Sequence, residues 1–319
     1  MFRRLSIIGF ALLCGCSSIP DKDALALRYG KYTDMLQSET RLKGPRAGAD
    51  LLRTLIDNDP AIVDLCHGLS HEIGQSAYHT IGFEQAMAAE DDVCGSGYIH
   101  GVIETHLAKV PDLEVALFSL CAPDAAKCFH GLGHGLMDRS GNDLPGSLAQ
   151  CSRFERNHQK NQCAEGVFME NFDTNGEEHF SEYLKPDDIY FPCRGQTAVF
   201  EGVCALYAPR YYLRLHPGDY AGAYDWCMTE VPEGPRDACI KGFGSVSMKQ
   251  HIRNPVLVEQ MCDALPPEYA GFCIEGLVSY YVVHYASVTK GRELCAMLNQ
   301  ASVPICERIV AESEGFYEK

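Results

Sequence analysis

The arrangement of apolar and polar positions between residues 254 and 287 predicts two helices joined by a short loop. The first stretch, NPVLVEQMCDAL, has apolar residues at Val256, Val258, Met261 and Leu265. The loop PPEYAG follows with two prolines, and a long apolar stretch, FCIEGLVSYYVVHYAS, comes after it. Apolar residues three or four positions apart lie on one helix face, and prolines mark helix boundaries. This segment therefore predicts a helical hairpin.

Cysteines accompany this pattern as short-range pairs that recur along the chain. The pairs are Cys121 with Cys128, Cys151 with Cys163, Cys193 with Cys204, Cys227 with Cys239, Cys262 with Cys273, and Cys295 with Cys306. From Cys128 onward, the second members are 35, 41, 35, 34 and 33 residues apart. Such intervals are typical of two-helix repeats. We expect each pair to form a disulfide across the loop of its hairpin, and the remaining Cys66 and Cys94 to join each other.

The chain is therefore expected to be an all-α solenoid of about seven disulfide-clamped αα-hairpins, spanning residues 44–319. In five units a glycine lies three residues after the second cysteine, and Gly68 and Gly202 fit the same register with the cysteine displaced to Cys66 and Cys204. Glycine weakens a helix by about 1 kcal/mol relative to alanine. Its recurrence indicates that a neighbouring helix approaches closely there. The glycines in this register are Gly68, Gly97, Gly131, Gly166, Gly202, Gly242 and Gly276.

In repeat period and disulfide placement, residues from about 60 to 310 resemble the cysteine-rich secreted members of the Sel1-like and tetratricopeptide repeat class. This resemblance implies a concave surface that binds other proteins. A surface-tethered scaffold for another envelope protein is therefore one hypothesis for function.

The N-terminus has the pattern of a secretory signal, with Arg3 and Arg4 before an apolar stretch that ends at Leu13. The residues Leu13, Cys14, Gly15 and Cys16 resemble a bacterial lipobox. That resemblance implies a signal peptide at residues 1–15, an acyl lipid such as palmitate on Cys16, and a location on the periplasmic or outer-membrane face of the cell envelope. A flexible tether is expected at residues 16–43. The alternatives are an ordinary cleaved signal peptide and a membrane anchor.

Composition excludes some partners and supports this compartment. The formal net charge is -16, from 27 basic and 43 acidic residues. Nucleic acids are excluded as partners on this basis, because binding them needs clustered Lys and Arg. Without Cys14 and Cys16, the sixteen cysteines leave fourteen, an even number that suits seven disulfides in an oxidising compartment. No C-x-x-C is present, which argues against zinc ribbons and thioredoxin-type sites.

Five histidines share the register of the repeat glycines. When the residue three before each glycine is numbered zero, histidines fall at +2 or +6 of the first three units only. Positions +2 and +6 are one helical turn apart and share a face, so we expect these imidazoles to converge. Two acidic residues of the same units, Glu72 and Glu104, are expected as an extra ligand, an orienting partner or a general base. The five histidines are His67, His71, His100, His130 and His134.

Imidazole is a common ligand of Zn, Cu and Fe, so the leading hypothesis is a site for a transition metal or metal cofactor. The alternative is that these histidines form structural hydrogen bonds in packed helices. The motifs H-E-x-x-H, G-x-S-x-G and the P-loop are missing from the sequence, so no particular type of catalysis is indicated. Whether the protein is an enzyme stays open.

Overall fold

The computed structural model describes residues 22–59, 62–63, 65–123, 125–173 and 181–317. Within these ranges it has sixteen α-helices and no strand, so the predicted all-α class is confirmed. The first two helices are α1 (Lys22–Lys43) and α2 (Pro45–Asn58). The inner helices are α3 (Cys66–Ile81), α5 (Val93–Leu107), α7 (Ala126–Ser140), α9 (Asn157–Asp173), α10 (Ala198–Leu215), α12 (Glu233–Gln250), α14 (Pro267–Tyr285) and α16 (Val303–Tyr317). The shorter helices between them are α4 (Phe83–Ala88), α6 (Leu113–Ser119), α8 (Leu144–Ser152), α11 (Tyr220–Thr229), α13 (Pro255–Asp263) and α15 (Val288–Met297), with a 3₁₀ turn at Phe191–Cys193.

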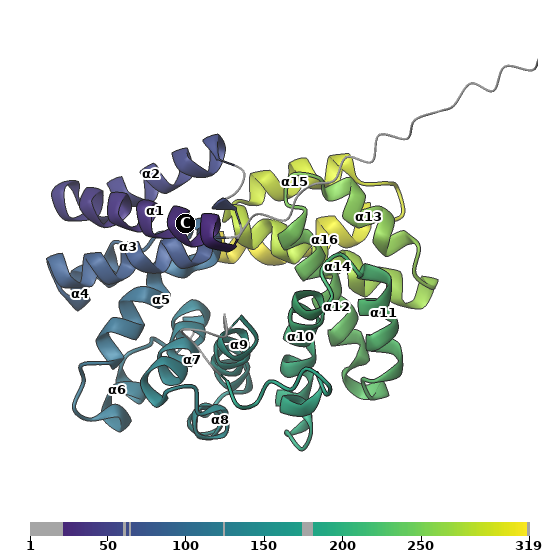
Figure 1. The fold of residues 1–319 in the computed structure, drawn as a ribbon, viewed down its shortest axis with the longest axis horizontal. Coiled ribbons are helices and arrows are strands. Elements are labelled where there is room, and N and C mark those ends of the chain that lie inside the picture. Colours follow the sequence, from purple (N-terminus) through teal and green to yellow (C-terminus); the bar gives the residue numbers. More distant parts are fainter. Residues whose placement is uncertain (1–21, 60–61, 64, 124, 174–180, 318–319) are drawn as a thin grey trace, which may run out of the picture.

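The inner helices form a curved array whose two ends meet. Each contacts the next along the chain, from α3 to α16, and α14 also contacts α5. Figure 1 shows the chain curving round until the last helices lie beside the first ones. Two hydrogen bonds link residues far apart in sequence: Arg253 Nη2 donates to the Ile56 carbonyl at 2.8 Å, and Lys127 Nζ donates to the Phe316 carbonyl at 3.3 Å. The inner helices therefore surround a common centre.

All seven predicted disulfides are present. Six of them join residues 7 to 12 positions apart, each across the connection into an inner helix. The seventh, Cys66 to Cys94, spans 28 positions and ties the start of α3 to the start of α5.

The repeat glycines do allow close helix contacts, with one exception. A Cβ atom on Gly97 would collide with the carbonyl oxygen of His67, and one on Gly166 would collide with that of His130. The backbones of α3 and α5, and of α7 and α9, therefore approach closely where the histidines lie. The expectation is wrong for Gly202, where a Cβ would meet no atom within 4 Å.

The expected tether is wrong for residues 22–43, which form α1. This helix packs against α2 and α3, and Leu36 and Thr40 are fully buried. Part of the docking is polar: Tyr32 donates a hydrogen bond to Asp59 at 2.8 Å, and Gln37 donates one to Glu72 at 2.8 Å. A hydropathy pattern does not indicate such polar contacts, so the sequence predicted no packing of this segment against the rest of the protein. Residues 1–21, with the expected signal peptide and Cys16, lie outside the described residues.

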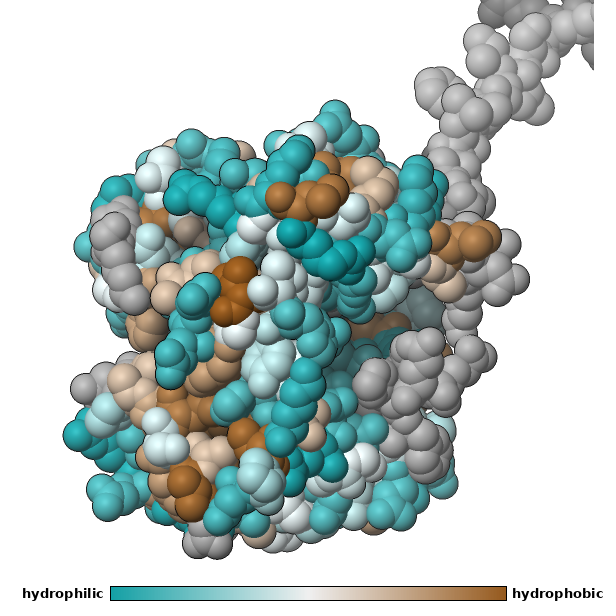
Figure 2. All heavy atoms as spheres, turned by 90° about the vertical axis from the view of Figure 1, so that its left-hand side faces the viewer, coloured by the Kyte–Doolittle hydropathy of each residue, from teal (hydrophilic) through white to brown (hydrophobic). Residues whose placement is uncertain are grey.

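None of the helices in the described ranges combines the length and apolar character that crossing a membrane requires. Figure 2 shows the side of the molecule that is on the left in Figure 1, where apolar patches are divided by polar side chains.

Candidate metal centre

Three neighbouring inner helices bring the five predicted histidines together. His67 and His71 extend from α3, His100 from α5, and His130 and His134 from α7. The ring centroids of His67 and His71 are 4.7 Å apart, those of His100 and His134 are 4.7 Å apart, and those of His67 and His134 are 6.1 Å apart. Such convergence follows from the shared register and from the close approach at the glycines.

Three of these imidazoles form a candidate ligand set. One ring nitrogen from each of His67, His100 and His134 lies within 4.8 Å of those of the other two. In a tetrahedral site with bonds of about 2.1 Å, ligand nitrogens are about 3.4 Å apart, so shifts of an ångström or so would complete such a site. His100 and His134 are each only 2% exposed.

Hydrogen bonds to Nδ1 orient the rings. Nδ1 of His71 lies 3.1 Å from an oxygen of Glu104, and Nδ1 of His134 lies 2.9 Å from an oxygen of Glu170. Nδ1 of His67 lies 2.8 Å from the carbonyl oxygen of Cys94. These oxygens accept hydrogen bonds, so each Nδ1 is the donor, and in the neutral rings each Nε2 presents its lone pair to the centre. Carboxylate and carbonyl partners of this kind are typical of metal-binding histidines.

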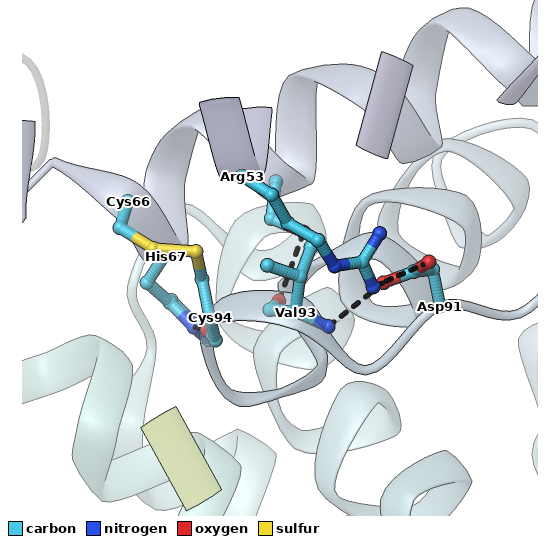
Figure 3. Close-up of a disulfide and its surroundings, with 7 residues drawn as sticks. Arg53, Cys66, His67, Asp91, Val93 and Cys94 are labelled. Carbon is cyan, nitrogen blue, oxygen red and sulfur yellow. Dashed lines mark hydrogen bonds and ion pairs between the residues drawn. A yellow bond between two sulfur atoms is a disulfide. The ribbon is translucent and has the colours of Figure 1, made fainter. Parts of the chain in front are cut away.

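The carbonyl that holds His67 belongs to an unusual turn at the start of α5. Cys94, Gly95 and Ser96 all have positive φ values, of 59°, 73° and 62°. Non-glycine residues seldom adopt this conformation, and it is often found at functional sites. The turn brings the Cys94 carbonyl to His67, beside the Cys66 disulfide (Figure 3).

An ion pair secures the same turn from outside. Arg53 of α2 donates two hydrogen bonds to Asp91, at 2.7 and 2.9 Å, and Asp91 accepts a further one from the backbone nitrogen of Val93 at 2.9 Å (Figure 3). The start of α5 is therefore fixed to both α2 and α3.

Two contacts between ring nitrogens stand out chemically. Nε2 of His67 and His71 are 3.1 Å apart, and Nε2 of His130 and His134 are 3.2 Å apart. Nδ1 of both His67 and His71 donates to an oxygen, so two Nε2 lone pairs face each other there and repel. This contact becomes favourable when one ring has an extra proton or when both nitrogens face a shared cation. At the other contact, Nε2 of His130 is free to donate to the lone pair of His134 Nε2.

Burial and mutual repulsion determine which rings are neutral. Burial, followed by the neighbouring imidazoles, lowers the pKa of His67, His100 and His134 well below the usual 6.5. For His71, burial alone would lower the pKa, but the carboxylates of Glu104, Glu170 and Glu72 together outweigh it, and the pKa is raised. The three candidate ligands are therefore neutral at pH 7, the state in which imidazole binds a metal.

One buried nitrogen in the cluster has no partner among the described residues. This is Nδ1 of His100, which makes no hydrogen bond although its ring lies between the other four. A buried polar atom without a partner costs about 1–3 kcal/mol, so native proteins rarely keep one without a reason.

The two predicted carboxylates have different positions. Glu104 lies in the cluster as the partner of His71, whereas Glu72 lies away from it. Glu72 accepts hydrogen bonds from Tyr29 at 3.1 Å and Gln37 at 2.8 Å, both on α1. The prediction of Glu72 as a metal-site residue is therefore wrong, because the side chain at +7 points towards α1.

Sequence reasoning missed Glu170 and Glu165, which come from α9. Glu170 is the partner of His134, and an oxygen of Glu165 lies 3.8 Å from Nδ1 of His130. The signal was available: Glu165 occupies +2 of the fourth unit, the position of His67 and His130 in their own units. It was overlooked because only histidines were followed through the register.

A cavity of about 350 Å³ adjoins the histidines at the centre of the array. Its walls come from α3, α5, α7, α9, α10, α12, α14 and α16, and include His67, His100 and His130. Comparisons with models of protein families, with curated proteins and with solved structures found no match to this chain.

Proposed function

We propose that this protein binds a transition-metal ion at the histidine cluster, as a lipid-anchored protein of the bacterial cell envelope. The observation that supports the metal site most directly is the set formed by the half-buried His67 and the buried His100 and His134. His71 and His130 adjoin it as further ligands, and Glu104 and Glu170 orient rings through Nδ1. Imidazole ligands suit zinc, copper or iron.

A metal explains features that a structural role leaves costly. At the His67 and His71 contact, both Nδ1 atoms donate to oxygens, so two Nε2 lone pairs face each other at 3.1 Å. A shared cation removes the repulsion there and gives the unpaired His100 nitrogen a partner. Structural histidines would instead be expected to have both ring nitrogens hydrogen-bonded.

The envelope location is supported by the seven disulfides, which persist in oxidising compartments. The lipobox resemblance of residues 13–16 supplies the proposed attachment, an acyl chain on Cys16. We further interpret the clamped helix pairs as repeats of one solenoid, curved until its ends meet. Incorporation of labelled palmitate, abolished by Cys16→Ser, tests the attachment.

Elemental analysis tests the metal site. Protein folded in an oxidising compartment is expected to contain close to one or more metal equivalents, and His100→Ala/His134→Ala is expected to lose them. The matched control, His158→Ala/His216→Ala, removes two exposed histidines outside the cluster and should retain the metal. Metal-free wild-type protein that takes up no zinc, copper or iron on titration would reject the proposal and favour the scaffold hypothesis.

A further inference from the structure

The central cavity has two chemically different sides. Apart from α10, the same helix face lines it in unit after unit: position +2 supplies His67, His130, Glu165 and Lys241, and position +6 supplies His100, Met169, Ser245 and Ser279. Histidines therefore occupy this face on α3, α5 and α7, whereas α12 and α14 place basic and hydroxyl side chains on it. From α10, Tyr207 and Arg210 reach the cavity from a different face of their helix. The metal hypothesis accounts only for the first side.

Basic residues are concentrated in the cavity wall. Its charged residues are Lys127, Arg210, Lys241 and Lys249, against the single carboxylate of Glu165. The whole chain has the opposite balance, with 27 basic and 43 acidic residues. A cavity that gathers cations in an acidic protein is suited to attract and hold an anion.

Two of these cations have hydrogen-bonding capacity left. Lys241 lies 3.7 Å from Glu275, and Lys249 lies 3.9 Å from Asp173, which are long distances for ion pairs. Neither ammonium group donates a hydrogen bond to any residue in the described ranges. By contrast, Lys127 donates to Asp92 at 2.6 Å, so its charge is already matched.

Arg210 of α10 adds a third positive group to the cavity wall. Its side chain is 12% exposed, pairs with Asp173, and lies over the Tyr207 ring at 4.7 Å. Asp173 is therefore shared by Arg210 and Lys249, which leaves part of their combined charge uncompensated. Hydroxyl groups of Ser245, Ser279 and Tyr280 line the same side and could donate further hydrogen bonds.

We propose that the cavity binds a small organic anion, whose carboxylate or phosphate group is held by Lys241, Lys249 and Arg210. A volume of about 350 Å³ suits a small molecule. The remainder of the ligand extends towards His67 and His100. In that orientation it meets the metal centre, a part of the inference that rests on the proposed function.

Calorimetric titration tests this proposal with succinate, inorganic phosphate and neutral succinamide. Wild-type protein is expected to bind succinate or phosphate at one site and succinamide at least about tenfold more weakly. In Lys241→Gln/Lys249→Gln, anion affinity should fall at least about tenfold, because two charged donors are lost. The anion that binds more tightly identifies the preferred group.

The control Lys43→Gln/Lys290→Gln removes the same charge from exposed positions outside the cavity and should bind like wild type. Equal affinity in the cavity variant, or no binding of either anion to wild type, would overturn the proposal. Metal content is measured on the same samples. Lysine-dependent anion binding by wild type that takes up no metal would reject the metal centre alone, and metal uptake without anion binding would reject the anion site alone.

Discussion

At the scale of single residues, Glu104 and Glu72 are expected to have different roles. Glu104 orients a histidine of the metal site, whereas Glu72 supports the fold. Glu104→Ala removes the acceptor of His71 Nδ1 and should weaken metal affinity about 10- to 100-fold. Glu72→Ala removes contacts to α1 and should leave metal affinity unchanged while lowering the free energy of unfolding by about 1 kcal/mol. Competition with a chromogenic chelator and denaturant unfolding measure the two effects. Equal metal affinities in the two variants would contradict this assignment.

His284 provides a pH test that does not involve a proposed ligand. Burial, with a smaller contribution from the Lys249 charge, lowers its pKa from 6.5 to about 4, and it is 6% exposed. As the pH falls below 6.5, the unfolded chain takes up a proton that the folded protein does not. The folded state should therefore lose about 1.4 kcal/mol per pH unit, or about 3 kcal/mol by pH 4.

The control for this prediction is His284→Gln, which cannot titrate. Unfolding of metal-free protein by guanidinium chloride, followed from about pH 7 to pH 4, should show a shallower loss in the variant than in wild type. The other histidines contribute equally to both profiles, so the difference isolates His284. Parallel profiles would disprove its role.

The sequence predicted the histidines better than their partners, for a physical reason. Register fixes which face of a helix a residue occupies, and this was sufficient to bring His67, His100 and His134 together. The partner of each Nδ1 depends on the distance and rotation between neighbouring helices. Neither Glu170 nor the Cys94 carbonyl could be assigned from spacing alone.

At the scale of elements, α1 is the clearest departure from expectation, and it can be tested directly. Leu36 is fully buried, so Leu36→Ala should lower the free energy of unfolding by about 2–5 kcal/mol. Leu27, on the same helix, is 76% exposed, and Leu27→Ala should change it by less than about 0.5 kcal/mol. If denaturant unfolding shows a negligible change in unfolding free energy for both variants, the prediction of a tether would be supported instead.

Helices with apolar periodicity were predictable, whereas α1 was not. The segment from Asn254 to Ser287 was expected to be a hairpin, and α13 and α14 occupy it with their boundary at the two prolines. In α1, tyrosine and glutamine side chains provide part of the docking through hydrogen bonds. A pattern based on hydropathy contains no signal for such contacts.

At the scale of the whole molecule, the sequence specified the neighbours of each helix but not the closure of the array. The cysteine interval indicates that successive units stack, and the seven disulfides confirm the pairing. Closure depends on the angles between neighbouring helices, which the spacing of cysteines along the chain does not determine. The central cavity, formed by residues from eight helices, was therefore beyond sequence reasoning.

The disulfides are expected to differ in their effect on metal affinity, although they contribute similarly to stability. Loss of Cys66 to Cys94 or of Cys295 to Cys306, by paired serine substitutions, should each cost about 3 kcal/mol of unfolding free energy. Only the first releases the turn whose carbonyl orients His67, so only Cys66→Ser/Cys94→Ser should also weaken metal affinity, by about tenfold or more. Unfolding and chelator competition measure the two quantities. An equal loss of metal affinity in both variants would mean that overall stability, and not this turn, holds the histidines in place.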